Sequence, residues 1–301
     1  MRLIRIPRLA LAVVAVIAVI AAFTACSGPA ASNAPSNPAM AKAPPATYYL
    51  ALGDSLSQGV QPNAAGVSVM TGDGYPDLVY AALHPSRPGL KLVKLGCPGE
   101  TTTSMINGGI CRYRGGSQLA AAVAFLQAYR GRVLLVTLDI GANDPEACGG
   151  QPGLGQLATC AVRDIPAAVD HLGTIMARLK AAAGPGVRIV GMTYYLPALA
   201  EWHSGLSGHM VAWAAEKLAA TYNRLLTRVY VKSGARVANV FGAFETADFG
   251  TAANSSVPRN VDRLCQWTWE CAAPPRGPNQ HANQAGYRVI ARAFLQAVGL
   301  S

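Results

Sequence analysis

Charged side chains are scarce in this chain. Asp, Glu, Lys and Arg together make up 13% of its 301 residues, whereas hydrophobic residues make up 51%. So little charge beside so much apolar side chain excludes a disordered protein and is typical of a parallel sheet buried on both faces. The length allows one large α/β domain or two small ones.

Clusters of basic residues are also lacking, although the formal net charge is +10. No run of Lys and Arg occurs, and no basic stripe carries interleaved aromatic residues. Arg2, Arg5 and Arg8 lie in a segment that we expect to be removed, which leaves +7. The charge therefore gives no support for a nucleic-acid partner.

The longest apolar run is too short to span a membrane. It extends from Leu9 to Phe23, about 15 residues, where a spanning helix needs about 20. A basic segment precedes it and small residues ending in Cys26 follow it, so residues 1–26 are interpreted as an export signal. The end of this segment resembles a bacterial lipobox, with Phe23 where Leu is usual. We expect a lipid anchor on Cys26; secretory cleavage just downstream and a retained anchor are the alternatives, and all three are extracytoplasmic.

Cysteine usage agrees with export. Apart from Cys26 there are six cysteines, and no Cys-x-x-Cys pair indicates a metal site. An even number in an exported chain is typical of disulfides. Sequence separations of 14, 12 and 6 favour three pairs: Cys97–Cys111, Cys148–Cys160 and Cys265–Cys271.

Residues 27–46 are rich in Pro, Ala, Ser and Asn and predict a flexible tether to a single domain over 47–301. In that domain, short apolar runs alternate with helical patterns, which indicates an α/β fold with a parallel five-stranded sheet and helices on both faces. The expected strands are Tyr48–Leu52, Leu90–Leu95, Val133–Leu138, Val187–Met192 and Arg236–Val240. The expected helices are Pro76–Leu83, Gln118–Arg130, Ile165–Ala182, His209–Val231 and Gln284–Val298.

Four residues at the ends of these elements match the needs of ester hydrolysis. Ser55, Gly99 and Asn143 follow the first three strands, and His281 precedes the last helix. Ligands bind outside the carboxyl ends of parallel strands, so the four can converge on one edge. Asp54 precedes Ser55 and should face away from the substrate, holding the loop.

Acyl transfer needs a nucleophile, a base and donors to the oxyanion. Ser55 is the candidate nucleophile at a strand-to-helix turn, where its own N–H can also hold the oxyanion. The N–H of Gly99 and the side-chain amide of Asn143 are further donors. His281 is the candidate base, because imidazole shuttles protons near neutral pH. Alone, each residue could be an ordinary cap or turn residue; their combination favours catalysis.

The motifs resemble those of the SGNH hydrolases, also called the GDSL esterase/lipase family, over about residues 47–300. The matching segments are Gly-Asp-Ser-Leu-Ser at 53–57, the turn around Gly99 at 95–102, Gly-Ala-Asn-Asp at 141–144 and the segment from His281 to Tyr287. The resemblance implies a flavodoxin-like three-layer α/β/α fold and cofactor-free hydrolysis of carboxylic esters. The absence of a Gly-x-Ser-x-Gly elbow disfavours the α/β-hydrolases.

One position departs from the family pattern. An Asp usually stands three residues before the His and orients its ring, but that position is Pro278. We expect the backbone carbonyl of Pro278 to accept the ring N–H instead, with Asn279 as the second candidate and Asp262 as the third. Without a negative charge nearby, His281 should be less basic than in a full triad.

The sequence therefore favours an exported serine esterase or lipase acting on a small ester or lipid, monomeric, without metal or cofactor. A carbohydrate acetylesterase is the enzymatic alternative. The other class is a surface binding protein on the same fold that has lost turnover, which Pro278 supports. Two aromatic groups could line an acyl site or simply pack: the stretch Tyr194–Met210, and Trp267 with Trp269.

Overall fold

The computed structural model describes residues 47–146, 154–251 and 255–299. The expected signal, Cys26, the tether and Cys148 lie outside them. The central sheet has the order β4-β1-β5-β6-β7, and all neighbouring strands are parallel. Its strands are β1 (Thr47–Gly53), β4 (Leu90–Lys94), β5 (Val133–Asp139), β6 (Arg188–Met192) and β7 (Arg236–Ala238). The five expected strands are confirmed, with ends that move by at most two residues.

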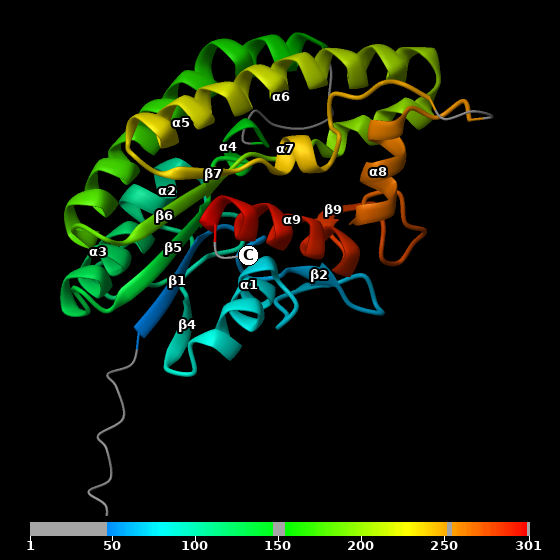
Figure 1. The fold of residues 1–301 in the computed structure, drawn as a ribbon. Coiled ribbons are helices and arrows are strands. Elements are labelled where there is room, and N and C mark those ends of the chain that lie inside the picture. Colours follow the sequence, from blue (N-terminus) through cyan, green and yellow to red (C-terminus); the bar gives the residue numbers. More distant parts are fainter. Residues whose placement is uncertain (1–46, 147–153, 252–254, 300–301) are drawn as a thin grey trace, which may run out of the picture. The chain divides into compact units, whose positions relative to one another are not determined.

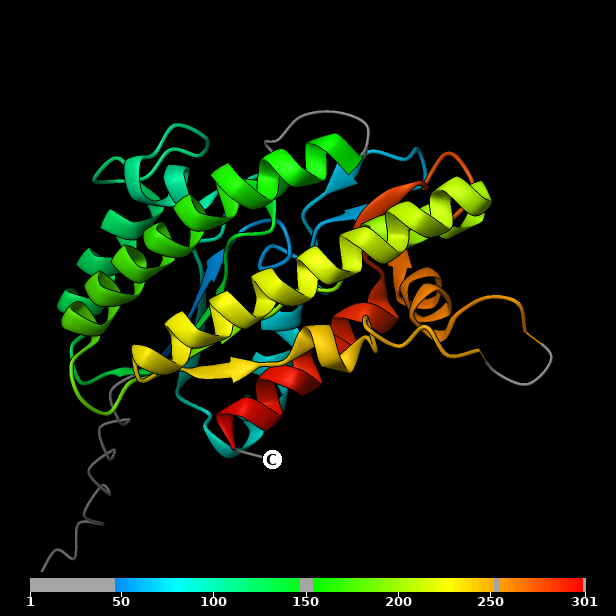
Figure 2. The ribbon, with the colours of Figure 1, turned by 90° about the horizontal axis from the view of Figure 1, so that it is seen from above.

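Helices cover both faces of this sheet (Figures 1 and 2). On one face α1 (Tyr75–Leu83) packs against α9 (Gln284–Val298), and on the other α3 (Gln118–Ala128) and α6 (Leu206–Lys232) pack against α5 (Leu154–Ala183). The three-layer α/β/α fold is therefore confirmed. No helix of the described residues is long and apolar enough to cross a membrane.

Several short elements, which the sequence did not predict, lie in the connections between these strands and helices. Helical segments of this kind are η1 (His84–Ser86), α2 (Thr102–Asn107), α4 (Asn143–Glu146), η2 (Pro197–Ser204), α7 (Val240–Ala243) and α8 (Arg259–Trp267). Two antiparallel strand pairs are β2 (Gln61–Pro62) with β3 (Ser68–Val69), and β8 (Thr268–Trp269) with β9 (Asn279–Ala282). Most of these elements are too short for a hydrophobic period to be recognised.

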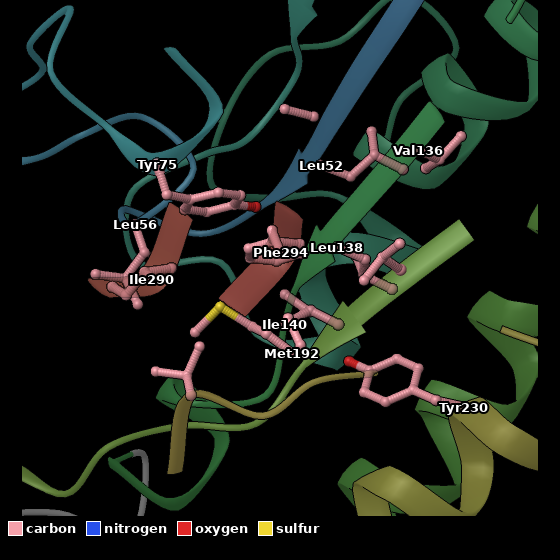
Figure 3. Close-up of a cluster of buried hydrophobic side chains, with 14 of the residues drawn as sticks. Leu52, Leu56, Tyr75, Val136, Leu138, Ile140, Met192, Tyr230, Ile290 and Phe294 are labelled. Carbon is pink, nitrogen blue, oxygen red and sulfur yellow. The ribbon is translucent and has the colours of Figure 1, made fainter. Parts of the chain in front are cut away.

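Buried apolar side chains pack on both faces of the sheet near the ends of the central strands (Figure 3). Leu52 and Leu138 are fully buried neighbours on the face that α6 covers, and Phe294 of α9 is fully buried on the other face. Tyr75 of α1 stacks on Phe294 with ring centroids 4.4 Å apart. Strands covered on both faces read as continuous apolar runs, which is why the sequence located them well. This packing holds the end of β1, from which the candidate nucleophile follows.

Candidate active site

A cavity of about 450 Å³ opens at the carboxyl edge of the sheet. Ser55, Asn143 and His281 all line it, although they come from distant parts of the chain. Gly99 is not among its lining residues, but its loop packs beside β1 through a hydrogen bond from the Cys97 N–H to the Gly53 carbonyl, 3.0 Å. The structure thus brings the expected nucleophile, base and amide donor to one cavity.

Side chains, rather than a helix, support the turn that carries Ser55. Residues 54–59 form a bend and turns, and α1 begins only at Tyr75, so the expected strand-to-helix turn was wrong. Asp54 Oδ1 accepts the Leu56 N–H at 2.9 Å, which agrees with its assignment to the loop. Asp139 Oδ2 accepts the Ser57 N–H at 3.1 Å. These hydrogen bonds hold the turn in one conformation and place Ser55 next to the end of β5.

Asp54 and Asp139 form a buried pair of carboxyls beneath this turn. Burial, and next the negative charge of Asp54, raise the pKa of Asp139 well above its ordinary value. The Tyr75 hydroxyl donates to Asp139 Oδ1 at 2.5 Å. Ionising both of two adjacent buried carboxyls is costly, so the raised pKa favours the protonated form of Asp139. The two carboxyls support the turn that carries Ser55.

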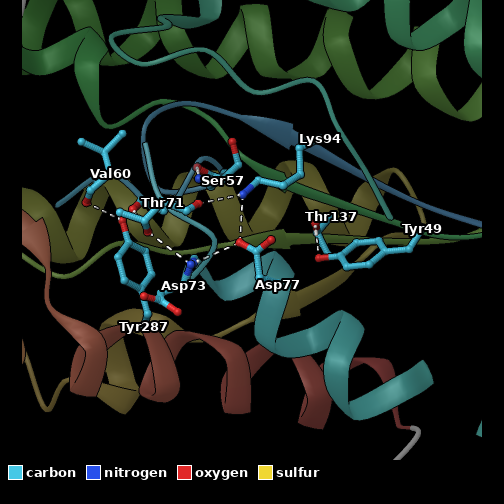
Figure 4. A network of polar contacts seen from close by, with 12 residues as sticks. Tyr49, Ser57, Val60, Thr71, Asp73, Asp77, Lys94, Thr137 and Tyr287 are labelled. Atoms are coloured by element: carbon cyan, nitrogen blue, oxygen red, sulfur yellow. Dashed lines mark hydrogen bonds and ion pairs between the residues drawn. The ribbon is translucent and has the colours of Figure 1, made fainter. Parts of the chain in front are cut away.

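Polar contacts also hold the loop that follows the turn (Figure 4). Lys94 forms an ion pair with Asp77 at 2.8 Å and donates to the Thr71 carbonyl. The Tyr287 hydroxyl of α9 donates to the Val60 carbonyl at 2.9 Å. The Thr71 hydroxyl in turn donates to the carbonyl of residue 59. The chain on the carboxyl side of Ser55 is thereby tied to β4, α1 and α9.

The backbone N–H groups expected to hold the oxyanion belong to Ser55 and Gly99. Gly99 has φ +80°, a left-handed conformation that favours glycine, and a Cβ there would meet no atom within 4 Å. Backbone geometry, and not lack of space, therefore requires glycine. In the part of the chain that the structure describes, the N–H groups of Ser55 and Gly99 have no hydrogen-bond partner. Both N–H groups are available to a ligand.

Asn143 begins α4, and its amide is fixed from one side. Nδ2 donates to the Glu100 carbonyl at 2.8 Å, which leaves its second hydrogen for a ligand. The neighbouring Asp144 accepts the Thr102 N–H at 2.9 Å. Burial raises the pKa of Asp144 above its ordinary value. These bonds join the loop of Asn143 to the loop of Gly99.

His281 lies in β9, just before α9. Its Nδ1 is 2.8 Å from Asn279 Oδ1, and its backbone N–H lies 3.1 Å from the same oxygen. A backbone N–H can only donate, so the amide atom that faces it is the oxygen and Nδ1 must carry the ring proton. Nε2 is then left with a lone pair, which is the tautomer that a general base needs.

This geometry corrects the expected orientation of the ring. The acceptor of the ring N–H is the side chain of Asn279, and not the Pro278 carbonyl or Asp262, which is exposed on α8. Side chains two residues apart in a strand point to the same side, so the Asn279 amide lies beside the His281 ring. Asn279 Nδ2 donates to Ser68 Oγ at 3.0 Å, which locks the amide.

Burial lowers the pKa of His281 to about 4. An uncharged amide partner does not oppose this shift, whereas a carboxylate would. The ring is therefore neutral at pH 7 and able to accept a proton. The expectation of reduced basicity agrees with this direction, with burial as the main cause.

Two disulfides flank the site. Cys97–Cys111 joins the loop of Gly99 to the segment before α3, and Cys265–Cys271 joins α8 to the turn after β8. Both are among the three expected pairs, and the third involves Cys148, outside the described residues. Because β8 pairs with β9, the second bond stabilises the ribbon of His281. His203 lies 3.7 Å from Cys265 Sγ, but both sulfurs there are bonded and hold no thiolate for a metal.

Comparisons with known proteins address the family and the fold of this chain. The profile of the GDSL-like lipase/acylhydrolase family matches residues 51–289. An extracellular lipase from Streptomyces rimosus is similar in structure, with a TM-score of 0.58 at 20% identity over 84% of this chain and 100% of that one. An acetylxylan esterase from Geobacillus stearothermophilus has a TM-score of 0.51 at 17% identity, over 85% and 96%. No curated protein sequence matches this chain.

Proposed function

This chain belongs to the GDSL-like lipase/acylhydrolase family, and we propose that it hydrolyses carboxylic esters through Ser55, with His281 as the general base. The observation that carries the proposal is the bond from His281 Nδ1 to Asn279, which leaves Nε2 unprotonated in the cavity that Ser55 lines. Membership of the family makes the chain an ester hydrolase; the roles of the individual residues are our proposal.

In the first half of the reaction, Ser55 Oγ attacks the carbonyl carbon while His281 Nε2 takes its proton. The oxyanion is held by the N–H groups of Ser55 and Gly99 and by Asn143 Nδ2. The tetrahedral species collapses as His281 returns the proton to the leaving alcohol. In the second half His281 deprotonates a water that attacks the acyl-Ser55 ester, and it then returns this proton to Ser55 Oγ as the acyl–oxygen bond breaks and the carboxylic acid leaves. No step requires a metal or cofactor.

The low pKa of His281 predicts an unusually acidic limit to activity. The neutral ring is the active form, so kcat/KM should be constant from about pH 5 to neutrality and fall about tenfold per pH unit below pH 4. Hydrolysis of p-nitrophenyl butyrate between pH 3 and 8 measures this, with circular dichroism at each pH as the control for folding. A limb between pH 6 and 7 in the folded enzyme contradicts the proposed environment of the ring.

We also propose that residues 1–26 direct export, that Cys26 carries a lipid and that residues 27–46 tether a monomeric domain, 47–301, to the membrane. The two disulfides support an oxidising compartment. Cys26→Ser is expected to move the protein from the membrane fraction to the soluble fraction of the producing bacterium. A wild-type protein that is soluble and begins downstream of Cys26 would show ordinary secretion instead.

A further inference from the structure

The cavity extends from the catalytic residues along one face of α6. Ala215, Leu218, Ala219 and Tyr222 all line it, and their spacing of three, four and seven residues puts them on one side of the helix. Tyr194 and further residues before and within η2 form the facing wall. We call this part of the cavity, between α6 and η2, the α6 arm. Two alanines on its helical wall leave open space that larger side chains would fill.

Most polar groups in the walls of the α6 arm are engaged in the protein; among the described residues, the buried hydroxyl of Tyr194 has no hydrogen-bond partner. Asn223 accepts the Tyr194 N–H at 2.8 Å and donates to the carbonyls of Tyr194 and Ala219. The Tyr222 hydroxyl donates to the carbonyl of residue 141, and the Tyr195 hydroxyl to that of Gln280. A sugar hydroxyl placed against these groups would lose its hydrogen bonds to water and gain few new ones from the protein, which disfavours binding of a sugar in the arm.

The charge and the volume of the cavity further limit which ligands can bind in the α6 arm. Glu201 and Glu270 also line the cavity, and their carboxylates would repel an acyl chain that ends in a carboxylate. A methylene group takes up roughly the share of one water molecule, about 30 Å³. The 450 Å³ cavity must hold the ester group as well as the chain, so an acyl chain of about six to ten carbons fits, and an acetyl group leaves most of the arm empty.

Resting on the proposed esterase function, we propose that the α6 arm is the acyl site, that it takes an uncharged aliphatic chain of medium length, and that Ala215 and Ala219 set the length it accepts. Of the two aromatic groups considered from the sequence, the one at Tyr194 provides a wall. Trp267 instead packs edge-on against Phe244, at 5.2 Å between ring centroids. The substrate class is thus an ester of a medium-chain fatty acid.

The test compares kcat/KM for p-nitrophenyl acetate, octanoate and palmitate. Wild-type enzyme should prefer octanoate. Ala219→Leu and Ala215→Leu should lower kcat/KM for octanoate by about tenfold or more while acetate changes less than about threefold. Leu218→Ala enlarges the arm and should shift the preference toward longer chains. Ala220→Leu is the matched control, half-buried on the same helix but outside the cavity, and should leave the profile unchanged.

The possible outcomes separate this inference from the proposed function. The proposed acyl site is overturned if the wild type prefers p-nitrophenyl acetate. It is also overturned if Ala215→Leu and Ala219→Leu lower kcat/KM equally for the acetate and the octanoate ester. The leucine variants could instead keep the acyl-chain preference and change the preference among acetate esters of different alcohols. That result would show that the α6 arm binds the alcohol portion, and it would also overturn the proposed acyl site. If the wild type hydrolyses no ester and resists a fluorophosphonate, it is the proposed function that fails.

Discussion

Ser55→Ala is expected to lower kcat for p-nitrophenyl esters by about 10⁵-fold or more, because the variant has no nucleophile to form the acyl-enzyme. The oxyanion donors and the cavity would remain, so a residual rate above that of water is expected. Kinetics with substrate in excess measures the loss. A fluorophosphonate should add to Ser55 of the wild type, located by peptide mass spectrometry, and should not add to the variant.

The control for this experiment is Ser86→Ala, in η1 and outside the cavity, which should keep both turnover and labelling. The result also decides between the two functional classes. A folded wild type that neither turns over esters nor reacts with the fluorophosphonate would be a binding protein on this fold. If Ser55→Ala retained activity, the nucleophile would have to be another residue.

The residues that the sequence located well owe their visibility to strong local patterns. Leu52 and Leu138 belong to buried runs that only a covered parallel strand explains, and the β5 end leads directly to the turn before Asn143. Placement of Ser55 and Asn143 at one edge then follows from topology, since parallel strands end together. That part of the convergence was predictable, whereas His281 reaches the cavity from the antiparallel pair β8 and β9.

The support of these residues was not predictable, because it depends on contacts between segments without hydrophobic period. The turn that carries Ser55 is supported by Asp139, which is far along the chain, and the base is held by Asn279 and Ser68, which belong to two different two-stranded ribbons. Reading 279–282 as a strand would have placed Asn279 beside His281 by its period of two, but a strand of four polar and small residues has no apolar signature.

The role of Asn279 gives the second large effect. Asn279→Leu removes the acceptor at nearly constant volume, so the ring of His281 loses both its orientation and its fixed tautomer. Loss of the correct tautomer costs a serine hydrolase up to about 10⁴-fold in kcat, and we expect a loss on the order of 10³-fold here. Because Asn279 does not carry out a chemical step, fluorophosphonate labelling of Ser55 should slow in parallel rather than disappear.

Asn279→Asp is the matched variant that distinguishes orientation from mere folding. Its carboxylate can accept the same two N–H groups, and the Ser68 hydroxyl can rotate to donate to it. A negative charge beside the ring favours imidazolium, so the pKa of His281 rises and the acid limb of kcat/KM moves up by about one to three pH units, with activity kept at pH 8. If Asn279 had only a structural role, both variants would lose activity and the acid limb of kcat/KM would stay at the same pH. That outcome would mean that another group accepts the ring N–H of His281.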